Sequence, residues 1–268
     1  MSKKDFQNGF ALGLASGGII EVEDTTEIDN LEEIIDNSGV LEDTEGSVSE
    51  KVEQLIDKAK LGGKISVDSA YRFCEKNRLI NYLNRFDFSE CQNFEEMFNT
   101  ATLLTSVPLI DTSKALNITN MFYSCTALKE VNNLNTSHIS NADSLFSLCS
   151  SLTTVENLDT SKFNSFEWTF YNCSKLENVC LLDSANASSF NRAFDGCSRL
   201  KNISFVKESI KVSINFGWSS LLSAESIQSI IDGLAIVTTA QTLTLNSAIT
   251  LTDEQKATIE SKGWTLVF

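Results

Sequence analysis

Apolar residues recur every 24 positions between residues 91 and 206. One column is phenylalanine, at Phe98, Phe122, Phe146, Phe170 and Phe194. Three residues after the last four of these lies a cysteine column, Cys125, Cys149, Cys173 and Cys197, with Ala101 in the first unit. Three aliphatic columns start at Leu104, Val107 and Ile110. A fixed period of this length is typical of a solenoid, because one unit cannot bury its apolar face alone and stacks on its neighbours.

Each unit reads F-x-x-C-x-x-L-x-x-V-x-x-L-D-T-S and continues with a polar stretch. The L-x-x-V-x-x-L part is short and contains β-branched residues, so it predicts one short parallel strand per unit. The D-T-S part, for example at residues 159–161, favours a tight turn, because Asp and Ser side chains hydrogen-bond nearby backbone groups. The return stretch, for example residues 140–146, begins with polar capping types and ends apolar, which predicts a short helix.

The repeat register extends beyond its five clearest units in both directions. Upstream it places Cys74 in the phenylalanine column and Asp87 in the turn column, in a divergent unit that caps the amino-terminal end. Downstream it places Trp218 in the phenylalanine column and Leu221 in the cysteine column. We therefore expect a repeat domain of parallel strands, of the α/β class, over residues 64–217.

The pattern changes in the carboxyl-terminal part, which predicts an α/β capping unit over residues 218–268. An alternation of apolar and polar residues from Ile210 to Phe216 leads into it and predicts a half-buried strand. Helical spacing, capping residues and alternation then predict helix, strand, helix and strand over residues 223–233, 242–246, 252–262 and 264–268. This unit would cover the far end of the repeats.

Two segments of different composition precede the repeats. Residues 1–22 are apolar, Gly-rich and too short for a domain, so we expect a docking segment. Its candidate docking residues are Phe6, Phe10, Leu12 and Leu14. Residues 23–63 form an acidic linker with two short amphipathic helices, and Glu21 to Glu50 contains twelve acidic residues without Lys or Arg. These helices either bundle with copies of themselves or pack on the first repeat.

Residues 121–128, Met-Phe-Tyr-Ser-Cys-Thr-Ala-Leu, resemble the BspA-type leucine-rich repeat, which reads M-F-x-x-C-x-x-L before a strand and a D-T-S turn. The resemblance covers nearly half of the chain and implies a leucine-rich-repeat solenoid. The usual L-D-L-S-x-F before D-T-S is shortened here to V-x-x-L, so curvature and binding surface do not carry over. Such repeats serve many surface and binding proteins, so the resemblance fixes no single function.

Residues 3–18 resemble K-K-D-F-x-N-G-F-A-L-G-L-A-S-G-G, a common opening of proteins encoded beside tail genes in phages and prophages of low-GC Gram-positive bacteria. This resemblance implies a virion component of the tail, baseplate or a fibre, which docks through its amino terminus on other virion proteins or on itself. The repeats would face outward and bind a host-surface protein or glycan, or decorate the particle. The alternatives are a secreted BspA-like adhesin and an intracellular interaction module.

Composition argues against several other classes of function. The net charge of -15 disfavours binding to nucleic acid or anionic lipid. No apolar run approaches the roughly 18 residues that a membrane helix needs. The apolar stretch at residues 10–20 resembles the core of a signal peptide, but its flanks lack a clear cleavage site, and we expect it to be retained.

Candidate chemistry is sparse. The single histidine, His138, falls in a turn column where a solvated side chain is expected, and no phosphate-binding loop is found. C-x-x-C pairs are missing, so we expect no metal site, no cofactor and no enzymatic activity. Four of the seven cysteines occupy one repeat column, and stacked columns are expected to point inward. We therefore expect free, buried thiols, with disulfides or metal ligation as the alternative.

The remaining candidate is a binding surface formed by residues between the apolar columns, which project outward. The candidate partner-binding residues are Lys129, Glu130, Asn132, Glu156, Glu177, Leu181 and Phe205. Leu181 and Phe205 make this row more apolar toward the carboxyl end. They either mark a partner site or are covered by the capping unit.

Overall fold

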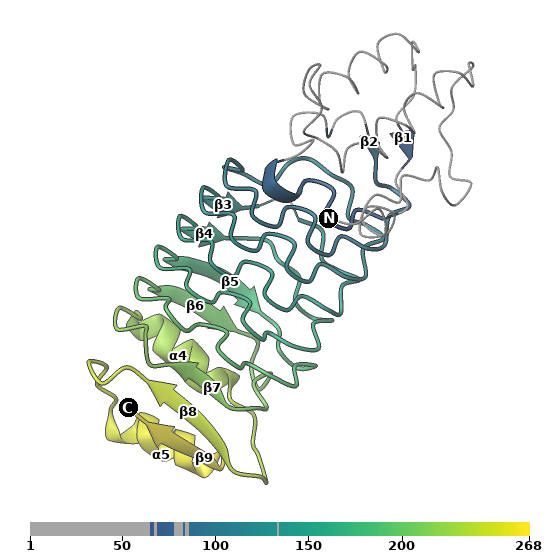
Figure 1. Cartoon of the computed structure of the whole chain (residues 1–268). Helices are drawn as coiled ribbons and strands as arrows, with labels where there is room; N and C mark the ends of the chain where they lie inside the picture. The colour runs from purple at the N-terminus through teal and green to yellow at the C-terminus, as the bar shows by residue number, and fades with distance from the viewer. Residues whose placement is uncertain (1–64, 67–68, 78–82, 84–85, 133) are drawn as a thin grey trace, which may run out of the picture.

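The protein is a mixed α/β structure in which units of the repeat lie side by side (Figure 1). The computed structural model describes residues 65–66, 69–77, 83, 86–132 and 134–268. The expected docking segment at residues 1–22 and the whole acidic linker with its two helices, residues 23–63, lie outside the described residues. None of the helices described is long and apolar enough to cross a membrane.

The strands of the described residues form three parallel sheets. In the first, β1 (Ile65–Ser66) pairs with β2 (Phe86–Asp87). The second has the order β3-β4-β5-β6, with bounds Glu130–Val131, Thr154–Val155, Asn178–Leu182 and Asn202–Phe205. The third has the order β7-β8-β9, with bounds Ile214–Phe216, Gln241–Leu245 and Trp264–Val267. The prediction of a short parallel strand per unit is confirmed in four units; the first contributes a single bridge, Ser106 to Glu130.

The phenylalanine column is a continuous stack through the core. Neighbouring rings from Phe98 to Phe194 lie 5.3, 5.6, 5.8 and 5.5 Å apart between centroids, and all four pairs are stacked. All five side chains are buried. Because each ring contacts the ring 24 residues away, the sequence period corresponds directly to the spacing between units.

The cysteine column is buried beside this stack, as expected, and its thiols are free. Each Sγ donates a hydrogen bond to the carbonyl oxygen of the phenylalanine 27 residues earlier; the Cys125 thiol, for example, lies 3.0 Å from the Phe98 oxygen. The other three bonds measure 3.0, 3.0 and 3.1 Å. The thiols therefore link successive units without a disulfide.

The D-T-S turns form as predicted. Asp159 Oδ1 accepts a hydrogen bond from the Ser161 amide at 3.0 Å, and Asp111 and Asp183 make the same turn. The hydrogen bond from the Ser161 side chain, together with this bond from its amide, lowers the pKa of the Asp159 carboxyl. The threonine between them is buried, and the Thr160 hydroxyl donates to the Asp183 carbonyl oxygen of the next unit at 2.9 Å. Each turn thus also connects neighbouring units.

The predicted helix in the return stretch is wrong. Residues 140–146 and their equivalents form consecutive turns instead, with two left-handed residues per unit, such as Ser144 and Leu148 at φ 56° and 64°. Amides in this stretch donate to the next unit rather than along a helix, as Phe146 does to the Thr169 oxygen at 2.9 Å. Contacts between units thus replace the local hydrogen bonds on which the helix prediction relied.

The predicted register at the carboxyl end is also wrong. Phe216, not Trp218, continues the aromatic stack, 4.8 Å from Phe194. Ser219 then takes the cysteine position and buried Leu222 the leucine position, whereas Trp218 and Leu221 are exposed. The last unit is therefore two residues shorter, so an extrapolated 24-residue spacing misplaces it.

The predicted carboxyl-terminal elements are confirmed. Helix α4 (Ala224–Gly233) is capped by Ser223, and helix α5 (Asp253–Ser261) by a capping box at Thr252. With β7, β8 and β9 they form two successive βαβ units, and Figure 1 shows them at the end of the stacked repeats. The alternation before them forms a strand only over β7, while Ile210 makes a single bridge to Leu234.

Helix α4 occupies the place where a further strand would pair with β6. The Ser226 hydroxyl accepts a hydrogen bond from the Ile203 amide, and the Ser229 hydroxyl accepts one from the Phe205 amide, both at 2.9 Å. Residues three apart on a helix share a face, as do residues two apart on a strand, so the two serines match the spacing of these amides. The helix thereby closes a sheet edge that would otherwise be available to another chain.

We expect the Ser226→Ala substitution to lower the free energy of unfolding by about 1–3 kcal/mol, because the buried Ile203 amide would lose its acceptor. Urea unfolding followed by circular dichroism measures the change. The matched control is Ser220→Ala at an exposed serine, which should change stability by no more than about 0.5 kcal/mol. Equal effects of the two substitutions would contradict this role for Ser226.

Candidate binding surface

The outward-facing residues of the four-stranded sheet lie in rows across the strands. Glu130 is in register with Thr154 of β4, and further pairs continue the row to Asn178 and Asn202. The side-chain amide of Asn202 donates a hydrogen bond to Asn178 Oδ1 at 2.7 Å. The sheet therefore presents a polar surface with a regular spacing from one strand to the next. We call this the strand face.

Six of the seven candidate partner-binding residues contribute to the strand face or its margin. Lys129, Glu130, Asn132 and Glu156 are exposed, and Glu177 is half-buried. Glu177 forms an ion pair with Lys201 in the next unit, at 3.1 Å between Oε2 and Nζ. Leu181 is 55% exposed. These residues come from neighbouring strands, so the structure brings them to one side of the sheet.

The expectation that Phe205 could face outward beside Leu181 is wrong. An irregularity in β5 shifts the register, so that Leu181 pairs with Ser204 and buried Leu182 pairs with Phe205. Phe205 therefore points into the core, where it is 5% exposed and contacts the rings of Phe190 and Phe216. The alternative expectation, cover by the carboxyl-terminal unit, holds for Phe205 and not for Leu181.

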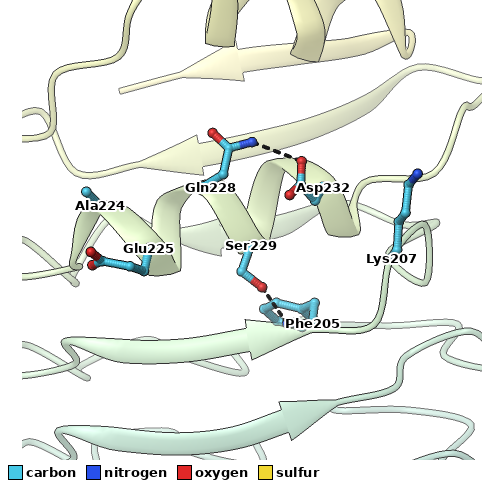
Figure 2. A pocket seen from close by; sticks show the side chains of 7 residues that line it. All are labelled: Phe205, Lys207, Ala224, Glu225, Gln228, Ser229 and Asp232. Carbon is cyan, nitrogen blue, oxygen red and sulfur yellow. Dashed lines mark hydrogen bonds between the residues drawn. The ribbon is translucent and has the colours of Figure 1, made fainter.

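A shallow depression of about 620 Å³ lies between the end of β6 and helix α4 (Figure 2). Lys207 stands at one end and Glu225 at the other, and Gln228 donates to Asp232 at 2.9 Å along its helical side. Ligand pockets usually enclose most of a small molecule. This open hollow with mixed charges does not form an enclosed small-molecule site.

A second surface, on the return stretch of two neighbouring units, was not found by sequence reasoning. The Trp168 and Tyr171 rings meet edge to face, 4.6 Å between centroids, and the Arg192 guanidinium carbon lies 4.7 Å from the centroid of the Trp168 ring. Beside them the side-chain amide of Asn191 donates a hydrogen bond to Glu167 Oε1 at 2.7 Å. We call these five residues the aromatic platform. The available signal was a tryptophan in a repeat column otherwise filled by polar residues.

The titratable side chains give no arrangement suited to catalysis within the described residues. His138 is exposed, as expected. Burial raises the pKa of the Cys125 thiol to about 12 and raises that of Cys149 and Cys173 well above the usual value, so these thiols are not nucleophiles at neutral pH. No group of His, Cys, Asp or Glu side chains in the described part of the chain could hold a metal ion.

These observations define a repeat protein with stacked 24-residue units and two candidate binding surfaces. Residues 65–155 and 93–206 each match the family described as "Mycoplasma protein of unknown function, DUF285". The two matches together span residues 65–206, more than half of the 268-residue chain, so the chain belongs to this family. Neither a curated protein nor a solved structure matches the chain.

Proposed function

We propose that this chain is a binding protein of a phage or prophage particle, attached by its amino terminus and carrying a BspA-type leucine-rich-repeat solenoid. The observation that carries the binding role is the strand face, where outward residues repeat from strand to strand in register. Its partner would be a host-surface protein or glycan. Solenoids commonly use such extended regular surfaces for binding.

Several structural features support the solenoid interpretation. Phenylalanine, cysteine and threonine each form contacts between successive units, through ring stacking, Sγ–H to carbonyl bonds and hydroxyl to carbonyl bonds. Helix α4 and the β7-β8-β9 unit follow at one end, in the manner of a terminal cap. The M-F-x-x-C-x-x-L motif favours the BspA type among leucine-rich repeats.

Attachment to a particle is supported by the K-K-D-F-x-N-G-F-A-L-G-L-A-S-G-G pattern at residues 3–18. This pattern resembles the openings of proteins encoded beside tail genes. Its apolar residues Phe6, Phe10, Leu12 and Leu14 are the proposed contacts with other virion proteins or with a second copy. The acidic composition of residues 23–46 suits a solvated linker between an attachment point and the repeats.

The test is co-sedimentation of the chain with particles released from a strain that carries the gene. We expect it to migrate with particles in a density gradient, and the double variant Phe6→Ala, Phe10→Ala to remain in the soluble fraction. Leu181→Ser, on the strand face, is the matched control and should still migrate with particles. A chain shortened at its amino terminus and found on the bacterial surface, never with particles, would instead support the secreted adhesin.

A further inference from the structure

The aromatic platform is not required by the repeat fold. Trp168 occupies one of the two left-handed positions of its unit, with φ 56°. The equivalent positions hold Arg72, Glu96, Asn120, Ser144 and Arg192, all with φ between 54° and 56°. A bulky side chain with positive φ is uncommon, since small polar residues such as Asn tolerate this conformation better. Since polar side chains fill this place in the other units, packing between units does not call for a tryptophan here.

The surroundings of Trp168 combine two kinds of contact. Trp168 and Tyr171 offer partly exposed aromatic surface, and the Arg192 guanidinium lies over the Trp168 ring. Glu167 and Asn191 supply a carboxylate and a planar amide beside the rings, and their single mutual bond leaves further donor and acceptor capacity. Apolar and directional polar groups are thus adjacent on one small area.

We propose that the aromatic platform is a carbohydrate-binding site. A sugar ring has a face of C–H groups that suits the negative face of an aromatic ring, and hydroxyl groups around its edge that hydrogen-bond carboxylates, amides and guanidinium groups. Because the Trp168 and Tyr171 rings are inclined by 61°, one ring would stack on the C–H face and the other would contact the edge of the sugar, while Glu167, Asn191 and Arg192 would bind the hydroxyls. The inference rests on the proposed binding function and places its glycan contact on the return stretch, away from the strand face.

The size and setting of the platform favour a sugar over a protein partner. A stable protein interface buries about 800 Å² on each partner around an apolar centre. Here the equivalent positions of the neighbouring units hold no aromatic side chain: Ser144 and buried Ser147 on one side, and Arg192 and Asp195 on the other. The two rings therefore form a small aromatic area without aromatic neighbours in the adjoining units.

The experiment measures binding of the full chain to an array of hexose, N-acetylhexosamine and deoxyhexose oligosaccharides, followed by titration with the best sugar. We expect the Trp168→Asn variant to weaken that binding about tenfold or more, as loss of a central aromatic contact does. Asn fills the same position at Asn120, so the variant retains a residue suited to the backbone. Tyr171→Ser, which introduces the residue type that the preceding unit has at Ser147, should weaken binding in the same direction.

Two controls make the result specific. Trp218→Ser removes another exposed tryptophan and should leave sugar affinity unchanged. Glu130→Ala, on the strand face, tests whether that face contacts the sugar instead. Each of three results would contradict sugar binding by the aromatic platform: absence of sugar binding, binding of a protein alone, or unchanged sugar affinity in a folded Trp168→Asn variant. Loss of affinity in Glu130→Ala but not in Trp168→Asn would also overturn it, yet would leave the strand face as the site of the proposed function. Co-sedimentation with particles tests attachment separately.

Discussion

Replacing Phe146 by alanine should lower the free energy of unfolding by about 3–5 kcal/mol. Phe146 is fully buried and stacks on Phe122 at 5.6 Å and on Phe170 at 5.8 Å. Its removal would leave a cavity between units on both sides. Because each unit of a repeat array contacts only its neighbours, this loss weakens two interfaces in the middle of the array. Urea unfolding followed by far-ultraviolet circular dichroism measures the change.

The matched control for this substitution is Phe268→Ala. Phe268 is 53% exposed at the carboxyl end, so its truncation should change stability by no more than about 0.5 kcal/mol. Phe146→Leu, which keeps most of the apolar volume, should fall between the two. If Phe146→Ala lowers the free energy of unfolding by no more than about 1 kcal/mol, the aromatic column is not the main contact between units.

The columns of the repeat could be predicted because each depends on one residue type in one environment. Phe98 and its equivalents are core residues in every unit, and Asp159-Thr160-Ser161 makes a turn from its own side chains. The return stretch could not be predicted in this way. Its amides, such as that of Phe146, find acceptors in a neighbouring unit. The order of polar and apolar residues within the return stretch favours a helix, but it does not reveal hydrogen-bond acceptors in a neighbouring unit.

Errors in register explain why the sequence misplaced Phe205 and Trp218. One irregularity in β5 moves Phe205 from the outer face to the core, and a short last unit puts Phe216 where Trp218 was expected. A shift of one residue in a strand exchanges its two faces, so small insertions have large consequences for surface predictions. The aromatic platform needed the opposite kind of reasoning, a search for residues that depart from their column.

Alkaline pH should destabilise the protein through its buried thiols. Burial raises the pKa of the Cys125 thiol from 9.0 to about 12, so the folded state favours the neutral thiol. Its contribution to stability is complete below the unfolded pKa and is lost as pH rises from about 9 toward 12, because only the unfolded chain can then ionise readily. At 1.36 kcal/mol per pKa unit, this amounts to a loss of about 2 kcal/mol by about pH 10.5.

The Cys125→Ala variant tests this linkage, and Ala101 shows that alanine fits the same column. At pH 8 the variant should be less stable than the unmodified protein, since it lacks the buried sulfur and its bond to Phe98. By pH 10.5 that deficit should shrink by about 2 kcal/mol, because the variant has no thiol to ionise at this position. Ser198→Ala at an exposed serine should show the same difference from the unmodified protein at both pH values. A deficit of Cys125→Ala that stays constant from pH 8 to pH 10.5 would mean that the thiol titrates alike in the folded and unfolded chains, contrary to its burial between two units.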